Sequence, residues 1–411
     1  MKRIFVASLG EGASDDLVRS LAPLIAVTVL SMQSELLGLL NAMPFLWFLL
    51  FAKQIGAAVD RMGPGRALLI GNLLRICIIS FLGIGLLAGV MSAALFLVGM
   101  ALLGLGDALF NTGRAALLPD IVGRKHVPEA MQRVESASAI ARVGSPALVS
   151  GLLRLLSQPA VFICGILGYF ISAVTFGMLI PKRHTGQTTR KRATNDTKSA
   201  WNVRRVLTTR GLSAVVLSNG LANSATMVSA VALIYFALDY VGVEPGNIPL
   251  IGVATALGGL VGAVMVTPLR TRFTEVRGKL LAVGLAGLSA LITPAAILIP
   301  DYGFWVLAAG AFLFSLWFTV GNVLGSGIPA LVIEPEQLGR GTAAITVITI
   351  GVMPAASLLG GFLVAAVEPL LTLVIAAAIV LCAAIPLWMA RDWQPPRPDD
   401  DSETPGEATA G

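Results

Sequence analysis

Charged residues are scarce in this chain, at 13% of 411 residues, about half the share of an ordinary soluble domain. Apolar residues make up 56%. A water-facing surface on a protein of this size needs far more charge than the sequence supplies. The shortage excludes an ordinary soluble domain and predicts an integral membrane protein whose outer surface faces lipid.

Cysteine and histidine are also rare, with three and two residues. Cys77, Cys164 and Cys382 each stand alone inside a long apolar segment, which excludes a disulfide framework and a cysteine metal cluster. His126 and His184 lie in polar loops without clustered ligands, so we expect neither to bind a metal. The sequence therefore predicts no metal site and no other cofactor.

The chain has no Gly-x-x-x-x-Gly-Lys-Ser/Thr loop. This excludes nucleotide hydrolysis of the P-loop kind by the chain itself, and we expect it not to be an enzyme. The net charge of +6 has a topological cause, given below, so we expect no nucleic-acid partner.

Long apolar runs dominate what is present. A bilayer core of about 30 Å is crossed by about 20 apolar residues in a helix. Segments of this length predict an all-α fold with twelve transmembrane helices. They lie at residues 12–31, 36–56, 67–90, 93–118, 130–157, 159–180, 212–238, 247–268, 279–299, 303–330, 341–366 and 369–390.

A polar stretch separates the first six apolar segments from the last six. The sequence predicts an N-terminal bundle at 1–180, a cytoplasmic linker at 181–211, a C-terminal bundle at 212–392 and a cytoplasmic tail at 393–411. The tail is rich in Pro, Asp and Glu and has too little apolar surface to order itself, so we expect it to be disordered.

Positive residues concentrate in alternate connections. Of 29 Lys and Arg residues, 25 lie at the N-terminus, in the linker, in the tail or in loops of that same side, including the group from Arg270 to Lys279. Positive loops stay in the cytoplasm, so both termini and the linker are predicted to be cytoplasmic. The first ten residues have no small-residue cleavage site after a short apolar core. We therefore expect no cleaved signal peptide, and the first segment to remain as a transmembrane helix. The abundance of Ala, Gly and Arg favours a bacterial cytoplasmic membrane.

The two halves of the chain share a pattern of prolines. Pro119 ends a helix and Pro146 lies inside the next segment; Pro329 and Pro354 recur in the second half, at offsets of 210 and 208 residues. Many transporters are built from structural repeats around a central site. The match predicts two pseudo-symmetric bundles of six helices.

The connection after the second segment carries Gly56, Asp60, Arg61, Gly63 and Arg66. This run resembles the signature of the major facilitator superfamily between its second and third helices. Asp60 can cap a helix end or pair with an arginine, and Gly63 allows a tight turn. The resemblance implies the major facilitator fold, with this cluster as a cytoplasmic latch. The usual basic pair after the second glycine is absent, which predicts a weaker or differently paired latch.

The fifth segment carries Gly144, Pro146 and Gly151. These resemble, in degraded form, the Gly-Pro motif of exporters in the superfamily. Proline and small residues bend and pack a helix at an interface that opens and closes. The stretches 114–119 and 339–341 resemble the branch that includes the enterobactin exporter. The resemblance implies alternating access and efflux of a drug or siderophore.

Ionisable residues inside the predicted helices are the candidates for proton coupling, because each costs about 2.5–3.5 kcal/mol at the centre of an inserted helix. The first segment holds Asp15, Asp16 and Arg19, the fourth Asp107 and the fifth Arg142. The resemblance implies that the first and fourth helices line the transport path. We hypothesise that one of these carboxylates binds the coupled proton, with an arginine setting its proton affinity. A static pair between Asp15 and Arg19 is the alternative.

Amide and aromatic residues mark the second half, with Asn219 and Asn223 on the seventh segment and Trp317 and Asn322 on the tenth. They are candidates for a substrate wall, with packing or lipid contact as the alternative for the aromatics. The sequence thus predicts a monomeric, proton-coupled antiporter that exports a small amphipathic organic molecule. Import, lipid flipping by the same fold and a non-transporting membrane sensor or scaffold remain alternatives.

Overall fold

The structure of the chain is a computed structural model that describes residues 2–180, 201–334 and 337–393. Most of the predicted linker and nearly all of the predicted tail lie outside these residues. The described residues form helices and their connections, without a strand. This confirms the all-α prediction.

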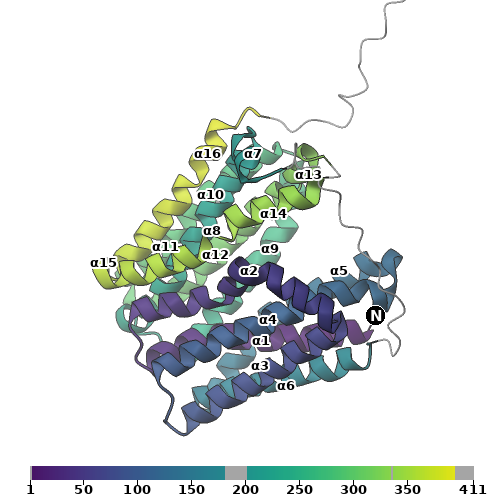
Figure 1. Cartoon of the computed structure of the whole chain (residues 1–411). Coiled ribbons are helices and arrows are strands. Elements are labelled where there is room, and N and C mark those ends of the chain that lie inside the picture. The colour runs from purple at the N-terminus through teal and green to yellow at the C-terminus, as the bar shows by residue number, and fades with distance from the viewer. Residues whose placement is uncertain (1, 181–200, 335–336, 394–411) are drawn as a thin grey trace, which may run out of the picture.

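The first half of the chain forms one bundle of six long helices (Figure 1). They are α1 (Lys2–Thr28), α2 (Ser34–Met62), α3 (Pro64–Leu87), α4 (Ala93–Val122), α5 (Val127–Leu153) and α6 (Gln158–Gly177). The first helix begins ten residues before the predicted segment at 12–31. The helix therefore continues beyond the apolar segment into charged N-terminal turns.

The second half forms another bundle, preceded by the short helix α7 (Val203–Thr208). Its long helices are α8 (Leu212–Tyr235), α9 (Ile248–Arg270), α10 (Glu275–Ala290), α12 (Gly303–Gly325), α14 (Leu338–Thr349) and α15 (Met353–Cys382). Its short helices are α11 (Ile292–Ala295), α13 (Ile328–Val332) and α16 (Ala384–Met389).

Nine stretches of the described residues are long and apolar enough to cross a membrane. The last, Leu338–Met389, has 52 residues and breaks at Glu368, where φ is 72° just before Pro369. A helix of that length spans about 78 Å, which is enough for two crossings of a core of about 30 Å. The helices α1 and α5 are not among the nine, and both carry several charges. The fold is confirmed as that of a multi-helix membrane protein, and the count of twelve crossings stays a prediction.

Glycines bring helices of one bundle together. A Cβ atom on Gly258 of α9 would lie 2.1 Å from the Phe312 carbonyl oxygen of α12, and one on Gly262 would lie 2.3 Å from that of Leu316. In the first bundle, a Cβ on Gly168 of α6 would lie 2.1 Å from the Gly10 carbonyl oxygen of α1. Such small-residue contacts are typical of helix packing in lipid.

The bundles meet through α2 against α15 and through α5 against α9. Ser357 Oγ donates to the Gly38 carbonyl oxygen at 2.8 Å. Ser150 Oγ donates to that of Gly246 at 2.7 Å. The Tyr235 hydroxyl donates to the carbonyl oxygen of Met32 at 2.7 Å. These bonds join the two bundles on the side of the α1–α2 connection.

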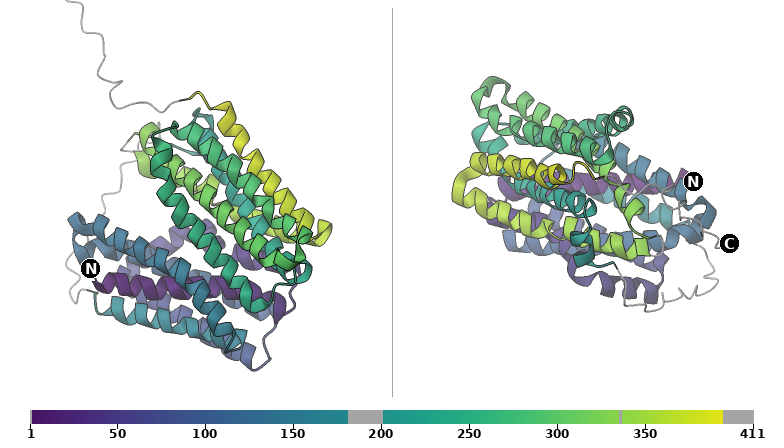
Figure 2. Two further views of the ribbon diagram at one scale, coloured as in Figure 1. Left: turned by 180° about the vertical axis from the view of Figure 1, so that it is seen from behind. Right: turned by 90° about the horizontal axis from the view of Figure 1, so that it is seen from above.

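On the opposite side, the bundles diverge. Figure 1 shows the N-terminal end of α1 and the start of α5 well apart from α7 and α13, and the reverse view in Figure 2 shows the same separation. The two halves therefore form a V that is closed at one end and splayed at the other.

Candidate functional site

A fully buried arginine lies in the core of the N-terminal bundle. The side chain of Arg75 on α3 is 0% exposed, and its Nε lies 2.7 Å from Asp107 Oδ1 on α4. Its Nη1 lies 3.7 Å from both Glu11 Oε1 and Asp15 Oδ1 on α1. One guanidinium thus faces three carboxylates from two other helices.

A second arginine extends this cluster toward the splayed side. Arg114 Nη1 on α4 donates to Glu11 Oε2 at 2.8 Å, and its Nη2 donates to Asn111 Oδ1 at 2.8 Å. Asn111 Nδ2 in turn donates to the Asp107 carbonyl oxygen at 3.0 Å. The polar groups of α1 and α4 therefore form one connected network.

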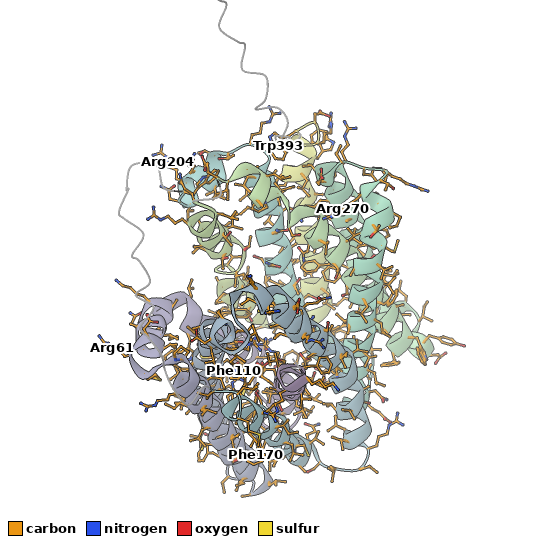
Figure 3. The ribbon with its side chains drawn as sticks, turned by 90° about the vertical axis from the view of Figure 1, so that its right-hand side faces the viewer. Arg61, Phe110, Phe170, Arg204, Arg270 and Trp393 are labelled. Atoms are coloured by element: carbon orange, nitrogen blue, oxygen red, sulfur yellow. The ribbon has the colours of Figure 1, made fainter. Side chains whose placement is uncertain are left out.

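Aromatic rings enclose the guanidinium of Arg75. Its central carbon lies 4.5 Å from the ring centroid of Phe110 and 5.0 Å from that of Tyr169 on α6. The Tyr169 hydroxyl donates to Asp15 Oδ1 at 2.6 Å. Figure 3 shows Phe110 in the interior of the N-terminal bundle. The rings exclude water from the arginine and add cation–π attraction.

Local sequence spacing explains how the cluster assembles. Glu11 and Asp15 are one helical turn apart and therefore share a face of α1. A Cβ atom on Gly71 of α3 would lie 2.8 Å from the Gly106 carbonyl oxygen of α4, and one on Gly106 would lie 2.9 Å from Arg75 Cγ. The two glycines bring α3 and α4 close enough for the arginine to reach its acid partners.

The charges of this cluster do not balance. Three carboxylates and two guanidinium groups are joined by contacts of 4.0 Å or less. Counted over these contacts alone, the cluster has one negative charge in excess, which one bound proton would neutralise. The side chains of Asp15 and Asp107 are 18% and 17% exposed. These two carboxylates are more exposed than Glu11, whose side chain is 5% exposed.

The predicted proton-coupling residues divide into two groups. Asp15 and Asp107 belong to the buried cluster, whereas half-buried Asp16 and exposed Arg19 and Arg142 lie outside it. Within the described residues, no ion pair of 4.0 Å or less involves these last three. Asp15 contacts the buried arginine of α3 rather than forming the static pair with Arg19 that the helical spacing allowed.

Sequence reasoning gave no role to Arg75. The sequence does single out Arg75, because it is the one charged residue in the otherwise apolar segment at 67–90. A single intramembrane arginine is a sign that carboxylates on other helices face it. The partners could not be assigned without the packing of α3 against α1 and α4.

A cavity of about 370 Å³ lies between the two bundles. Its walls come from α1, α2 and α4 on one side and from α8 and α9 on the other. Most of the lining is apolar, with Arg19, Ser20, Asn41 and Thr255 as its main polar groups. The cavity suits a molecule that carries both apolar and polar parts.

The predicted latch residues lie at the splayed side. Gly63, with φ of 87°, ends α2 and opens the turn into α3. Asp60 and Arg61 are exposed, and a Cβ atom on Gly56 would meet nothing within 4 Å. Figure 3 places Arg61 on the rim of its bundle. Arg66 begins the next helix, also exposed. The turn is as expected, and the latch contact stays a prediction.

The predicted bend of the fifth helix lies where the bundles meet. Pro146 is inside α5, with its Cβ 3.5 Å from the position of a Cβ on Gly252 of α9. A Cβ on Gly144 or Gly151 would meet nothing within 4 Å. The motif thus faces the other bundle at its proline, with space beside both glycines.

A buried lysine corrects one expectation about the second half. The sequence pattern counted Lys279 with the positive residues of a cytoplasmic connection, at the first residue of the predicted segment 279–299. It lies inside α10 and is 1% exposed. Its Nζ donates to Asn219 Oδ1 at 2.7 Å and to the Gly321 carbonyl oxygen at 3.0 Å. Gly325 leaves room for the side chain, since a Cβ there would lie 3.2 Å from Nζ. Exposed Asn322 borders the same small pocket.

The remaining substrate candidates have structural contacts. Asn223 Nδ2 donates to the Thr349 carbonyl oxygen at the end of α14, at 2.9 Å. Trp317 packs against apolar side chains of α9 and α10. None of the four predicted wall residues lines the cavity between the bundles.

Comparisons with known proteins agree with this architecture. Residues 4–273 match the family described as Major Facilitator Superfamily. No protein with curated information matches the chain. The chain is similar to a solved bacterial homologue of the iron transporter ferroportin in an inward-facing state, with a TM-score of 0.75 and 14% identity, covering 95% of this chain and 98% of that one.

Two further solved structures show the same fold at low identity. A bacterial metal transporter has a TM-score of 0.68 and 13% identity, covering 95% of this chain and 98% of its own. The nucleoside transporter NupG has a TM-score of 0.69 and 12% identity, covering 94% and 98%. The cargoes named for these neighbours differ, so the likeness supports the fold and leaves the substrate open.

Proposed function

The chain belongs to the Major Facilitator Superfamily, and on that premise we propose that it is a proton-coupled secondary transporter that exports a small amphipathic organic molecule by alternating access. The carrying observation is the buried cluster around Arg75, where three carboxylates face two guanidinium groups. A scaffold without transport has no need for charges that cost so much to bury.

The proton is held by Asp107 or Asp15 in this proposal. Both contact the buried guanidinium and both have partly exposed side chains. Binding a proton neutralises the cluster, and losing it restores a negative charge beside Arg75. The attraction between Arg75 on α3 and the carboxylates on α1 and α4 thus differs between the two protonation states. This difference favours different packing of the three helices in each state.

Alternating access follows from the V shape of the two bundles. The hydrogen bonds between Ser357 and Gly38 and between Ser150 and Gly246 hold one side closed. Breaking them and closing the splayed side would expose the cavity to the other face of the membrane. The positive residues predict that the splayed side is cytoplasmic. Twelve crossings, with both termini in the cytoplasm, complete this proposal.

The cavity lining supports an amphipathic organic cargo. Apolar walls are interrupted by a few polar groups, among them Asn41 and Thr255, as in sites that bind organic molecules. Within the described residues, no group of three or more His, Cys, Asp or Glu is arranged to hold a metal ion. Export is favoured by Pro146 of the exporter-like helix α5, which lies at the interface with α9.

Flux in proteoliposomes tests the proposal. The purified chain is reconstituted, and accumulation of a panel of neutral and charged drugs and siderophores is measured with and without a pH gradient. Proton-coupled export predicts accumulation that requires the gradient and runs opposite to proton flow. Accumulation in the direction of proton flow indicates import, movement of lipid alone indicates a flippase, and no flux of any compound contradicts transport.

A matched pair of variants assigns the proton. Asp107→Asn removes a carboxylate from the buried cluster, whereas Asp120→Asn makes the same change at an exposed position of the same helix. The first is expected to abolish gradient-driven accumulation and the second to leave it unchanged. Equal activity of both variants would remove Asp107 from the mechanism.

A further inference from the structure

A second cavity lies inside the C-terminal bundle. It has a volume of about 170 Å³, and its walls come from α8, α9, α10, α11, α12 and α15. Apolar side chains form most of its surface, among them Ala311 and Phe314 of α12 and Ala376 of α15. A cavity of about 150 Å³ lined by apolar groups holds a benzene molecule, so this one has room for a single ring or a branched alkyl group.

Two of the four hydroxyl groups that line this pocket donate hydrogen bonds within their own helices. Thr226 Oγ1 donates to the Ala222 carbonyl oxygen at 2.9 Å, and Thr255 Oγ1 donates to that of Ile251 at 2.9 Å. Their protons are therefore already used, and an apolar guest leaves no donor of these two groups unpaired. No Asp, Glu, Lys or Arg is among the pocket's lining residues.

The pocket adjoins the cavity between the bundles. Leu233 of α8 and Thr255 of α9 line both. A molecule in the larger cavity can therefore place an apolar group between these two residues and keep its polar part in the larger space. The charged cluster lies in the other bundle, with none of Glu11, Asp15 or Asp107 in the wall of either cavity.

We propose that the C-terminal bundle binds the cargo through this pocket, which takes an uncharged group of about one aromatic ring in size, while the proton is held in the N-terminal bundle. The inference rests on the proposed function and deepens it. Because the two ligands occupy different bundles, they do not compete for one group. They are coupled through the conformation that both of them bias.

Binding to the full chain in lipid nanodiscs tests the pocket. The probes are 3-phenylpropanol, 3-phenylpropionate and 3-phenylpropylamine, which share a ring and differ in charge. Ala376→Leu fills the pocket from α15, and Ala378→Leu adds the same atoms on the exposed face of that helix. We expect Ala376→Leu to weaken binding of 3-phenylpropanol about tenfold or more, since the ring loses its apolar site, and Ala378→Leu to leave it unchanged.

A second variant, made in another wall of the pocket, keeps the test valid if the first variant misfolds. Ala311→Leu fills the same pocket from α12 and is expected to weaken binding as Ala376→Leu does, with thermal unfolding of each variant as the check on folding. Unchanged affinity in either folded variant overturns the inference, as does absence of saturable binding of all three probes. Displacement of lipid from the pocket variants without any change in probe affinity shows a lipid-filled cavity and overturns it too.

Asp107→Asn tests the separation of the two sites. A direct contact between proton site and cargo would change affinity according to the charge of the probe, whereas coupling through conformation changes all three affinities by one common factor. We expect the common factor, and a change confined to the amine would overturn the separation. These measurements use no gradient, so loss of flux with probe binding intact counts against the proposed function alone.

Discussion

The cores of the two bundles solve the same packing problem with different chemistry. In the N-terminal bundle, Arg75 is buried against three carboxylates. In the C-terminal bundle, Lys279 is equally buried but contacts the amide oxygen of Asn219 and a backbone carbonyl oxygen. The net charge of the Arg75 cluster changes when one of its carboxylates gains a proton. The attraction between Arg75 and the carboxylates then changes as well. Within the part of the chain that the structure describes, both hydrogen-bond acceptors of Lys279 are neutral.

This contrast in core chemistry is the basis on which we propose different roles for the two similar halves. The helices of both bundles pack through glycines, as Gly71 and Gly106 do in the first and Gly258 and Gly262 in the second. The close approach holds a charge network in one half, while the other retains an apolar pocket bordered by hydroxyl groups.

Removing the arginine is expected to have the largest effect. Arg75→Met leaves Glu11, Asp15 and Asp107 without their shared countercharge, and loss of one partner of a buried ion pair costs about 3–5 kcal/mol. Reversible unfolding in detergent by a chemical denaturant measures the loss. Combining Arg75→Met with Asp107→Asn is expected to restore part of it. A full-stability Arg75→Met variant would show that the cluster is not held by this arginine.

The corresponding change in the other bundle is expected to have a smaller effect on stability. Lys279→Met replaces an ammonium whose partners are neutral, so it leaves only the Asn219 amide and a carbonyl unpaired. The expected change in unfolding free energy is about 1 kcal/mol, measured in the same assay. A loss as large as that of Arg75→Met would contradict the distinction between the two cores.

A glycine at the closed side of the V connects the halves. A Cβ atom on Gly361 of α15 would lie 2.5 Å from the Ser34 carbonyl oxygen of α2. Gly361→Ala forces these helices apart and is expected to cost about 1–3 kcal/mol in the closed-side contact, which slows flux. Gly284→Ala is the control, because a Cβ there meets nothing within 4 Å. Equal flux in both variants would show that this contact does not govern the transport cycle.

The smallest effect is expected outside the membrane. Trp201 Nε1 donates to Glu334 Oε2 at 2.5 Å, and Arg205 Nη2 lies 3.1 Å from Glu334 Oε1. The tryptophan hydrogen bond, with help from the arginine, lowers the pKa of Glu334 below its usual value. A carboxylate with a lowered pKa stabilises the fold above its unfolded-state pKa, and that stabilisation is lost as the pH falls through the folded value.

Glu334→Gln is therefore expected to lower the thermal unfolding midpoint slightly at neutral pH and to leave it unchanged in acid, where the wild-type carboxyl group is also neutral. The midpoint is measured across this pH range for both proteins. A wild-type midpoint that stays equal to that of the variant at every pH would contradict a role for the Glu334 charge.

The transmembrane helices could be predicted from the sequence because each needs a long apolar segment. Apolar length gave the helices, because lipid requires backbone groups to be satisfied within each segment. The ends were less accurate: α1 begins at Lys2 although the apolar run begins later, and α10 begins at Glu275, four residues before the predicted segment at 279–299. Helix ends and buried charges depend on tertiary partners, which a single segment does not reveal.

Only part of the candidate site, its carboxylates, could be predicted from the sequence. Asp15 and Asp107 stood out because a carboxylate in an apolar run is costly, and the structure brings them to one arginine. That arginine and the apolar pocket beside Ala376 depend on which helices pack together. Asn219 and Asn223 were predicted as substrate ligands, and this role stays a prediction. Their amides bond to Lys279 and to a backbone carbonyl oxygen, as polar groups within a bundle often do.

The most direct test of proton coupling separates exchange from accumulation in one preparation. Proteoliposomes with wild-type protein, Asp107→Asn or Asp120→Asn are loaded with a transported compound. Exchange at equal pH and accumulation under a pH gradient are then measured. We expect Asp107→Asn to retain exchange and to lose gradient-driven accumulation, and Asp120→Asn to retain both. Full gradient-driven accumulation by Asp107→Asn would contradict the assignment of the proton to the cluster around Arg75.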